Sequence, residues 1–224
     1  MSEFLYFLGV ILALISIVIS FNVKSKFKKW SKQPNSRGIT GCEIAATMLR
    51  LAGINDVEIA PVAGSLTDHY DTRTKTVNLS EDVYDKASIA AVAVAAHECG
   101  HAIQHYESYA PLSFRHTLFP VANIGSKAGF WIFVLGLFFG GIPFLLDLGI
   151  ALFAFAVLFH FVTLPVEFNA SKRALTVLRD SNVLTESEMP GAKSVLSAAA
   201  MTYVAAAASA IIQLLRLVAI RNDD

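Results

Sequence analysis

Four apolar stretches divide the chain, and the first of them carries no charge. It covers Phe4–Phe21, and at about 1.5 Å per residue it is just long enough to cross a hydrocarbon core of about 30 Å. A cleaved signal peptide would need basic residues before the run, whereas here the lysines follow it, beginning at Lys24. We therefore expect a retained transmembrane anchor, with the N-terminus outside and the following segment in the cytoplasm.

Three further apolar stretches lie in the second half of the chain. The blocks Phe130–Leu146 and Leu148–Leu164 are separated by Asp147, the only charged residue of that region. We expect them to form a transmembrane hairpin whose outer turn lies near Gly140–Gly141. The last stretch, Ala198–Ile220, is rich in alanine, which drives membrane insertion only weakly. It forms either a fourth span or a helix packed on the others, and we favour a span.

Residues 33–127 carry the shorter periodicities of a compact α+β domain. Ser80 can cap a helix, because serine accepts a hydrogen bond from the first free backbone N–H groups. The segment between the two expected strands is turn-rich or extended. The patterns predict a helix over Cys42–Leu51, strands over Val57–Ile59 and Thr74–Leu79, and an alanine-rich helix over Ala87–Gln104.

Composition supports a membrane protein and narrows the partners. The 224 residues are 54% hydrophobic and 16% charged, against about 25% charged in an average soluble domain. A formal net charge of zero gives no electrostatic case for a nucleic-acid partner. The two cysteines, Cys42 and Cys99, do not make a disulfide framework. A reduced, cytoplasm-facing location fits them better.

The candidate chemistry lies in His97-Glu98-Cys99-Gly100-His101. Residues four apart share one helix face, so the two histidines can present ring nitrogens to one zinc ion. A catalytic zinc site needs three protein ligands and one open position for water. Glu98 can reach that water without binding the metal, and zinc lowers the water pKa from about 15.7 toward about 7. Glu98 is therefore the candidate general base, and Gly100 leaves the helix surface open for a substrate backbone.

A solvated polar helix face is the alternative interpretation of this motif. The residues before His97, from Ser88 to Ala96, are almost uniformly apolar. The histidines therefore emerge from a buried element, where unpartnered polar groups cost several kcal/mol, roughly what a metal ion would offset. We favour a zinc site.

Together with its surroundings, this motif resembles the YugP-type neutral zinc metallopeptidases, an integral-membrane family more distantly similar to the HtpX and CAAX prenyl protease type. The resemblance covers nearly the whole chain. It implies His97 and His101 as zinc ligands, Glu98 as the base and Glu167 as the third ligand. It rests on Gly64–Asp71 (GSLTDHYD), Ala95–His105 (AAHECGHAIQH), Thr163–Leu175 (TLPVEFNASKRAL) and Ala198–Ala206 (AAAMTYVAA).

The position of Glu167 in the sequence also suggests a role, apart from the family resemblance. It follows Pro165 at the end of an apolar stretch, where a carboxylate is costly unless it is paired or bound to metal. The alternative is a glutamate in a salt bridge with a nearby lysine or arginine. The chain departs from the family's usual form at Asn169, where we expect an aspartate. It departs from the distant relatives at Ser171, where they carry an aspartate.

Other polar residues carry smaller hypotheses. His105 continues the face of the two histidines but lies another turn along, so a polar contact fits better than metal binding. His69 is a minority candidate ligand, and His160 fits a helix–helix contact better than a catalytic role. Cys99 is expected to be a small packing residue. Three residues could stabilise an oxyanion, and the sequence does not choose among them: Arg115, Arg173 and Tyr203.

The expected fold is mostly α, with a small α+β zincin-like catalytic portion and three to four transmembrane helices. An intramembrane protease is disfavoured, because the apolar run before His97 is only about ten residues, too short to span. The expected segments are an N-terminal anchor (1–22), a zinc-peptidase domain with the HExxH helix (23–127), a transmembrane hairpin (128–166), and a third-ligand helix with a C-terminal apolar helix (167–224).

The expected function is a Zn²⁺-dependent membrane metalloendopeptidase in a bacterial-type cell membrane, with its catalytic site facing the cytoplasm. The expected partners are a protein or peptide substrate and membrane lipid. An extended substrate would pair with a strand edge, and the candidates are Thr74–Leu79 and Leu66–Tyr70. The alternative function is a catalytically silent, zinc-stabilised membrane scaffold or adaptor. The intact Glu98 favours the enzyme, because a structural site needs no base.

Overall fold

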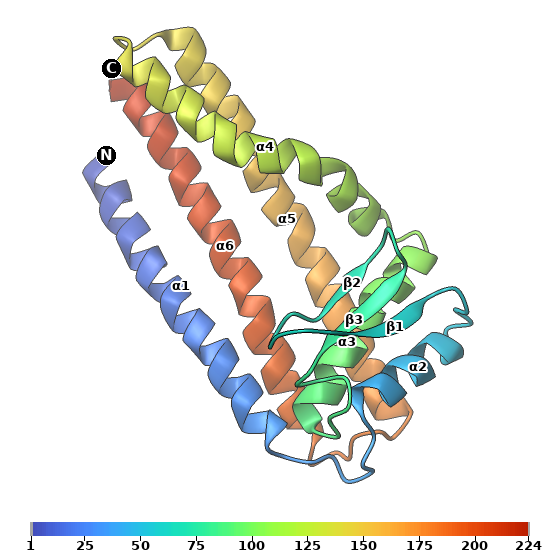
Figure 1. Cartoon of the computed structure of the whole chain (residues 1–224). Coiled ribbons are helices and arrows are strands. Elements are labelled where there is room, and N and C mark those ends of the chain that lie inside the picture. The colour runs from blue at the N-terminus through green and yellow to red at the C-terminus, as the bar shows by residue number, and fades with distance from the viewer. Residues whose placement is uncertain (1, 224) are drawn as a thin grey trace. The chain divides into compact units, whose positions relative to one another are not determined.

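The computed structural model describes residues 2–223, which form six helices and a three-stranded sheet (Figure 1). The predicted fold class, mostly α with a small α+β portion, is confirmed. In chain order the elements are α1 (Ser2–Ser31), α2 (Gly41–Leu51), β1 (Glu58–Val62), β2 (His69–Asp71), β3 (Thr76–Ser80), α3 (Ile89–Tyr106), α4 (Ala110–Phe138), α5 (Pro143–Asp180) and α6 (Met189–Asp223).

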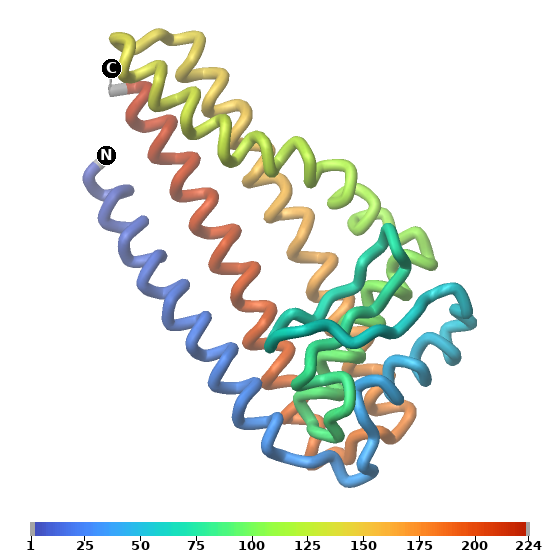
Figure 2. Tube along the Cα trace, viewed as in Figure 1, coloured from blue at the N-terminus to red at the C-terminus, as the bar shows by residue number. Residues whose placement is uncertain are grey.

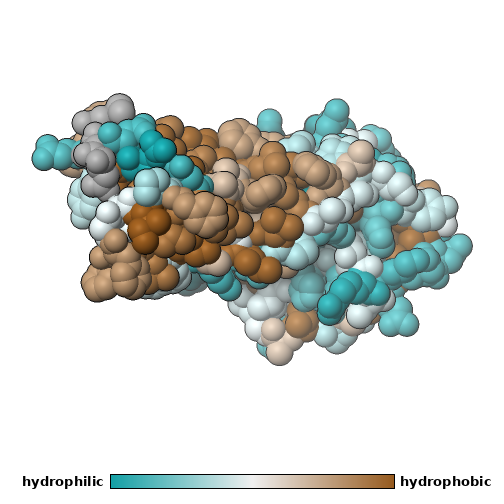
Figure 3. Space-filling view, turned by 90° about the horizontal axis from the view of Figure 1, so that it is seen from above, coloured by the Kyte–Doolittle hydropathy of each residue, from teal (hydrophilic) through white to brown (hydrophobic). Residues whose placement is uncertain are grey.

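Within residues 2–223, four helices are long and apolar enough to cross a membrane. They are α1, α4, α5 and α6, and their traces can be followed in Figure 2. The C-terminal stretch, for which a span was favoured over a packed helix, is therefore among the four candidate spans. Large apolar side chains are exposed along these helices, including Phe7, Trp131, Phe138 and Phe144, and Figure 3 shows a broad apolar area on the face in view.

The chain groups into two compact units. The helical unit holds the described residues up to 20, residues 110–165, and the described residues from 201 onward. The mixed unit holds residues 21–109 and 166–200. The predicted boundary between 127 and 128 falls inside α4, and the four predicted segments stay a prediction.

Close helix packing in the helical unit depends on small residues. A Cβ on Gly129 of α4 would lie 2.9 Å from the Gly149 carbonyl oxygen of α5, and one on Gly149 would lie 2.7 Å from that of Gly129. The two backbones therefore approach in a way that larger residues would prevent. A small apolar core forms beside this contact from Phe133, Leu146 and Leu217.

The predicted hairpin turn is confirmed, but the predicted helix ends are wrong. Gly140 and Gly141 take φ of 87° and 74°, which separates α4 from α5. Asp147, expected to lie between two apolar blocks, instead lies near the start of α5. It is the fifth residue of that helix and pairs with Arg221.

The mixed unit is built on the sheet, whose strand order is β1-β3-β2 (Figure 1). β3 pairs parallel with β1 and antiparallel with β2. The predicted strand at Thr74–Leu79 is confirmed as the central strand, and its Val77 and Leu79 are fully buried. The edges belong to β1 and β2, so β3 is not the free edge that could pair with a substrate.

Caps define the two short helices of the mixed unit. Thr40 and Glu43 form a reciprocal capping box at the start of α2. Ser88 caps α3 by accepting a hydrogen bond from the Ala91 backbone N–H at 3.1 Å. The prediction that Ser80 caps a helix is wrong. Its backbone N–H and its hydroxyl both donate to the Asp68 carboxylate, at 2.7 and 3.0 Å, and this holds the end of β3 in place.

Candidate metal centre

Three side chains from two helices converge in the mixed unit. His97 and His101 lie one turn apart on α3, with ring centroids 4.8 Å apart, and Glu167 approaches them from α5. The Glu167 Oε2 atom lies 3.3 Å from His97 Nε2 and 3.5 Å from His101 Nε2. One ligand atom from each residue falls within 4.8 Å of the others. The Glu167 side chain is only 3% exposed, whereas the side chains of His97 and His101 are partly exposed, at 13% and 12%.

Gly100 explains how α5 comes so close to α3. A Cβ at this position would lie 2.8 Å from the Ala170 carbonyl oxygen of α5, closer than real side chains allow. The expectation that Gly100 stays open for a substrate backbone is therefore wrong, since α5 occupies that surface. Ala170 lies three residues after Glu167, almost one helical turn. Because α5 approaches α3 closely at Gly100, the Glu167 carboxylate lies next to the two histidines.

Each histidine is held through the ring nitrogen that faces away from Glu167. Ser171 Oγ lies 3.1 Å from His97 Nδ1, and Gln104 Oε1 lies 3.0 Å from His101 Nδ1. Metal-binding histidines usually have such a partner, which fixes the ring orientation and leaves the other nitrogen for the metal. Ser171 thus contacts His97 from the position where the distant relatives carry an aspartate.

A chain of hydrogen bonds fixes the tautomer of His101. The Arg173 Nε–H can only donate, and it donates to Asn169 Oδ1 at 2.8 Å. The same oxygen and the Val166 carbonyl accept from Gln104 Nε2, at 3.0 and 2.8 Å. The amide oxygen of Gln104 must then face His101, whose neutral ring donates from Nδ1. Its Nε2 therefore presents a lone pair toward Glu167.

Sequence reasoning missed Gln104, and a signal for it was available. It lies three residues after His101, a spacing that places both side chains on one helix face. Its side chain is fully buried, so an amide at this position needed a polar partner. Asn169, found where an aspartate was expected, accepts two hydrogen bonds through its neutral oxygen and puts no further carboxylate beside Glu167.

Glu98 lies on the same helix but outside the three-residue cluster. It is buried, at 9% exposure. Burial raises the pKa of Asp68, and the nearby charge of Glu98 contributes to that rise. Asp68 belongs to the Gly64–Asp71 motif, so this motif lies close to the predicted base. The role of Glu98 stays a prediction.

The pKa of His101 reflects two opposed effects. Burial, the largest single effect, lowers it, whereas the hydrogen bond and charge of Glu167 and the charge of Glu98 raise it. The net pKa lies above that of an ordinary histidine. A proton therefore competes with any metal for this ring, and metal binding would release it.

The other candidate residues lie elsewhere. His69 is exposed and its Nδ1 contacts the Thr67 carbonyl at 2.8 Å. His105 makes the expected polar contact, at 2.9 Å to the Tyr70 hydroxyl. The side chain of Cys99 is fully buried and packs as predicted, and burial raises the pKa of its thiol. Of the oxyanion candidates, Arg173 pairs with Glu107 at 2.6 Å, and Arg115 and Tyr203 belong to the helical unit.

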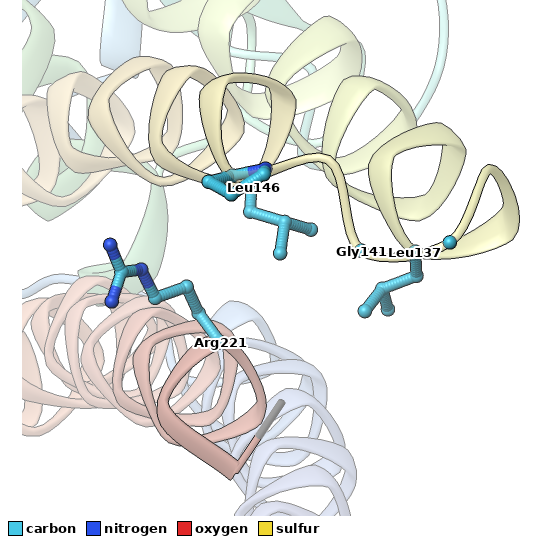
Figure 4. Close-up of a pocket in the computed structure, with 6 residues that line it drawn as sticks. Leu137, Gly141, Leu146 and Arg221 are labelled. Atoms are coloured by element: carbon cyan, nitrogen blue, oxygen red, sulfur yellow. The ribbon is translucent and has the colours of Figure 1, made fainter.

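A cavity of about 470 Å³ in the helical unit holds none of the predicted site residues. Figure 4 shows Leu137 and Leu146 on one side of it and Arg221 of α6 on the other. The Arg221 guanidinium donates to Asp147 at 2.9 and 3.2 Å. Its cation is therefore already paired.

Comparisons with known proteins agree with the resemblance. The profile of a family described as "Putative neutral zinc metallopeptidase" matches residues 5–222. The chain therefore belongs to this family. A curated relative, "Putative membrane protease YugP" from Bacillus subtilis (strain 168), is 48% identical over 206 residues, which cover 92% of this chain and 91% of the relative. No solved structure matches the chain.

Proposed function

We propose that this protein is a membrane-bound zinc metalloendopeptidase that hydrolyses peptide bonds of proteins at or near the cytoplasmic membrane face. One observation carries the proposal: His97, His101 and Glu167 place their ligand atoms within 4.8 Å of one another beside the buried Glu98. Membership of a family described as zinc metallopeptidases supports it. The membrane setting is supported by four long apolar helices and by the description of the relative.

The donor set suits zinc in chemistry and in number. His97 Nε2, His101 Nε2 and a Glu167 carboxylate oxygen would hold the ion, a two-histidine, one-glutamate set found in hydrolytic zinc sites. A bound zinc ion would polarise a peptide carbonyl and make a water molecule acidic enough to ionise near neutral pH. Gln104 and Ser171 would hold the two rings in register for binding.

Glu98 would act on protons rather than on the metal. Its carboxylate takes the proton of the attacking water and later delivers a proton to the leaving amine. Glu98 directly follows His97, so its side chain points to a different side of α3 from the two ligands. The nearby Asp68 carboxylate is occupied by two hydrogen bonds from Ser80, which leaves Glu98 as the available base.

The substrate would bind along β2. β2 is an edge strand and is tied to α3 through the hydrogen bond between Tyr70 and His105. An extended peptide can add to such an edge through backbone hydrogen bonds. Of the two candidate segments, this favours Leu66–Tyr70 and removes Thr74–Leu79.

The decisive variant for the activity is Glu98→Gln. Its amide cannot accept the water's proton, so we expect hydrolysis to fall by roughly 10²- to 10⁴-fold, with zinc content unchanged. New protein N-termini can be counted by mass spectrometry in membranes from cells expressing the wild type or the variant. Identical sets of N-termini, with both proteins zinc-loaded, would favour the silent scaffold instead.

The side of the membrane can be tested separately. The lysines after the first span favour a cytoplasmic catalytic site, with the α4–α5 turn outside; Met1, also expected outside, is beyond the described residues. In a Cys42→Ser background, Ser65→Cys should react with an impermeant maleimide only in inverted vesicles. Phe139→Cys, at the turn, should react in intact cells. The reverse pattern would move the proposed activity to the outer face.

A further inference from the structure

A cavity of about 580 Å³ in the mixed unit combines basic, hydroxyl and apolar groups. Its volume falls in the ordinary range of ligand sites, about 300–1,000 Å³. It lies between the last turns of α1 and the loop that joins β1 to β2, and neither the three cluster residues nor Glu98 lines it. The lining residues are Lys24, Phe27, Lys28, Ser31, Lys32, Ser65, Leu66 and Asp82.

The three lysines of this cavity share one face of α1. They are spaced four residues apart, so their ammonium groups follow one another along the helix. All three are exposed, and within residues 2–223 none of them takes part in an ion pair. Asp82 is the only acidic group of the lining. The lining therefore has a surplus of positive charge that Asp82 alone does not neutralise.

The other lining groups complete a site for an amphipathic anion. Ser31 lines the cavity, and its hydroxyl has no hydrogen-bond partner in the part of the chain that the structure describes. Leu66 is 39% exposed and takes a φ of 58°, which turns the loop at this position. Phe27 adds an apolar surface between the lysines. Phosphate oxygens could meet the lysines and the hydroxyl while a hydrocarbon part meets the two apolar side chains.

The helix itself indicates where such a ligand comes from. Phe21 of α1 is 69% exposed, and Lys24 follows it after less than one helical turn. The cavity thus begins where the apolar stretch of a candidate span ends, at the level of lipid headgroups. Basic side chains just beyond a span attract anionic lipids. A soluble anion or an acidic peptide would have no such link to the end of the span.

We propose that this cavity is a binding site for the headgroup of an anionic phospholipid, held by Lys24, Lys28 and Lys32 with the Ser31 hydroxyl. The site uses none of the cluster residues, so its test is separate from that of the proposed metal centre, although Leu66 also begins the segment proposed to bind the substrate. The bound headgroup would contact Ser65 and Leu66, which belong to the Gly64–Asp71 motif; Asp68 of the same motif lies near Glu98.

The chain offers a matched control for the test. Lys24→Gln/Lys28→Gln removes two charges from the cavity, and Lys26→Gln/Lys29→Gln removes two charges from the same helix outside the lining. The full-length proteins are reconstituted in nanodiscs of phosphatidylcholine with phosphatidylglycerol. Spin-labelled forms of each lipid then report the preference for the anionic headgroup.

We expect the wild type to prefer phosphatidylglycerol, and the cavity variant to lose that preference by roughly fivefold or more. The control variant should stay within about twofold of the wild type. An equal loss in both variants would mean diffuse surface charge and overturn the site, as would no loss in either. Binding of a soluble acidic peptide that depends on Lys24 and Lys28, with the lipid preference unchanged, would assign the cavity to a peptide instead. If the double variant fails to fold, Lys28→Gln alone carries the same test.

Discussion

Two ion-pair-like contacts, one in each unit, have similar distances and very different energetics. In the helical unit, Asp147 and Arg221 meet at 2.9 Å with side chains 55% and 42% exposed. In the mixed unit, Glu167 lies 3.3 Å from His97 with its side chain 3% exposed. An exposed pair contributes little, because water solvates both partners almost as well. A buried carboxylate beside two imidazoles is costly unless a proton or a metal ion compensates it.

This difference in burial indicates that the Glu167 cluster, and not the Asp147 pair, is the functional site. A polar cluster that costs stability is retained when it binds something, whereas an exposed pair can be lost with little effect. The hydrogen bonds around the cluster strengthen this interpretation, since Gln104 and Ser171 use buried polar groups only to hold two rings. Nothing comparable surrounds the Asp147 pair among the described residues.

Removing both histidines should give the largest effect. His97→Ala/His101→Ala deletes two of the three ligands, so we expect zinc content to fall to background. Metal that binds only the folded state stabilises it. A chelator should therefore lower the melting temperature of the wild type and leave that of the variant unchanged. Full zinc occupancy in the double variant would end the metal-site proposal.

Gln104→Met should have an intermediate effect. The thioether is only a weak acceptor for the His101 Nδ1–H group, so the tautomer and orientation of the ring are no longer fixed. Losing such an outer partner typically weakens metal binding by about 10- to 100-fold. Zinc affinity is measured by competition with a chromophoric chelator.

The control for Gln104 acts on the next residue of α3, His105, through Tyr70 of β2. Tyr70→Phe removes the hydroxyl that contacts His105, a histidine outside the cluster. Its zinc affinity should equal that of the wild type. If both variants weaken zinc equally, general loosening of α3 explains the result better than the tautomer of His101.

The smallest effect is expected at the exposed pair. Asp147→Asn removes the charge that meets Arg221, in the helical unit, whereas every cluster residue belongs to the mixed unit. We expect unchanged zinc affinity and unchanged release of new N-termini in the membrane assay. A marked loss of either would show that the exposed pair and the metal centre are energetically linked.

Local chemistry made part of the site predictable from the sequence. Four-residue spacing placed His97 and His101 together, and an apolar run before them indicated burial. Glu167 needed the family resemblance, because it lies 66 positions after His101 along the chain. The contacts of Ser171 and Asn169 could not be predicted, since they depend on how closely α5 crosses α3 at Gly100.

The misplaced elements have the same physical cause. Ser80 and Ser88 are equally good helix caps in isolation, and only the tertiary contact with Asp68 commits Ser80 to β3. Hydropathy found the apolar C-terminal part of α4 but not its start at Ala110, because the first turns carry polar residues. The hydrophobic pattern of the sequence predicts whether a segment is a helix or a strand. Contacts between residues far apart in the sequence determine where that segment ends and what it packs against.

The most direct test of the central claim is a zinc-loaded structure of the wild type, with Glu167→Gln measured beside it. We predict two histidine nitrogens, from His97 and His101, at about 2.0–2.1 Å from the ion and a Glu167 oxygen at about 2.0–2.2 Å. Glu167→Gln should bind zinc far more weakly while the helices still assemble. A structure in which His69 or His105 lies within about 2.1 Å of the zinc, with Glu167 elsewhere, would contradict the account.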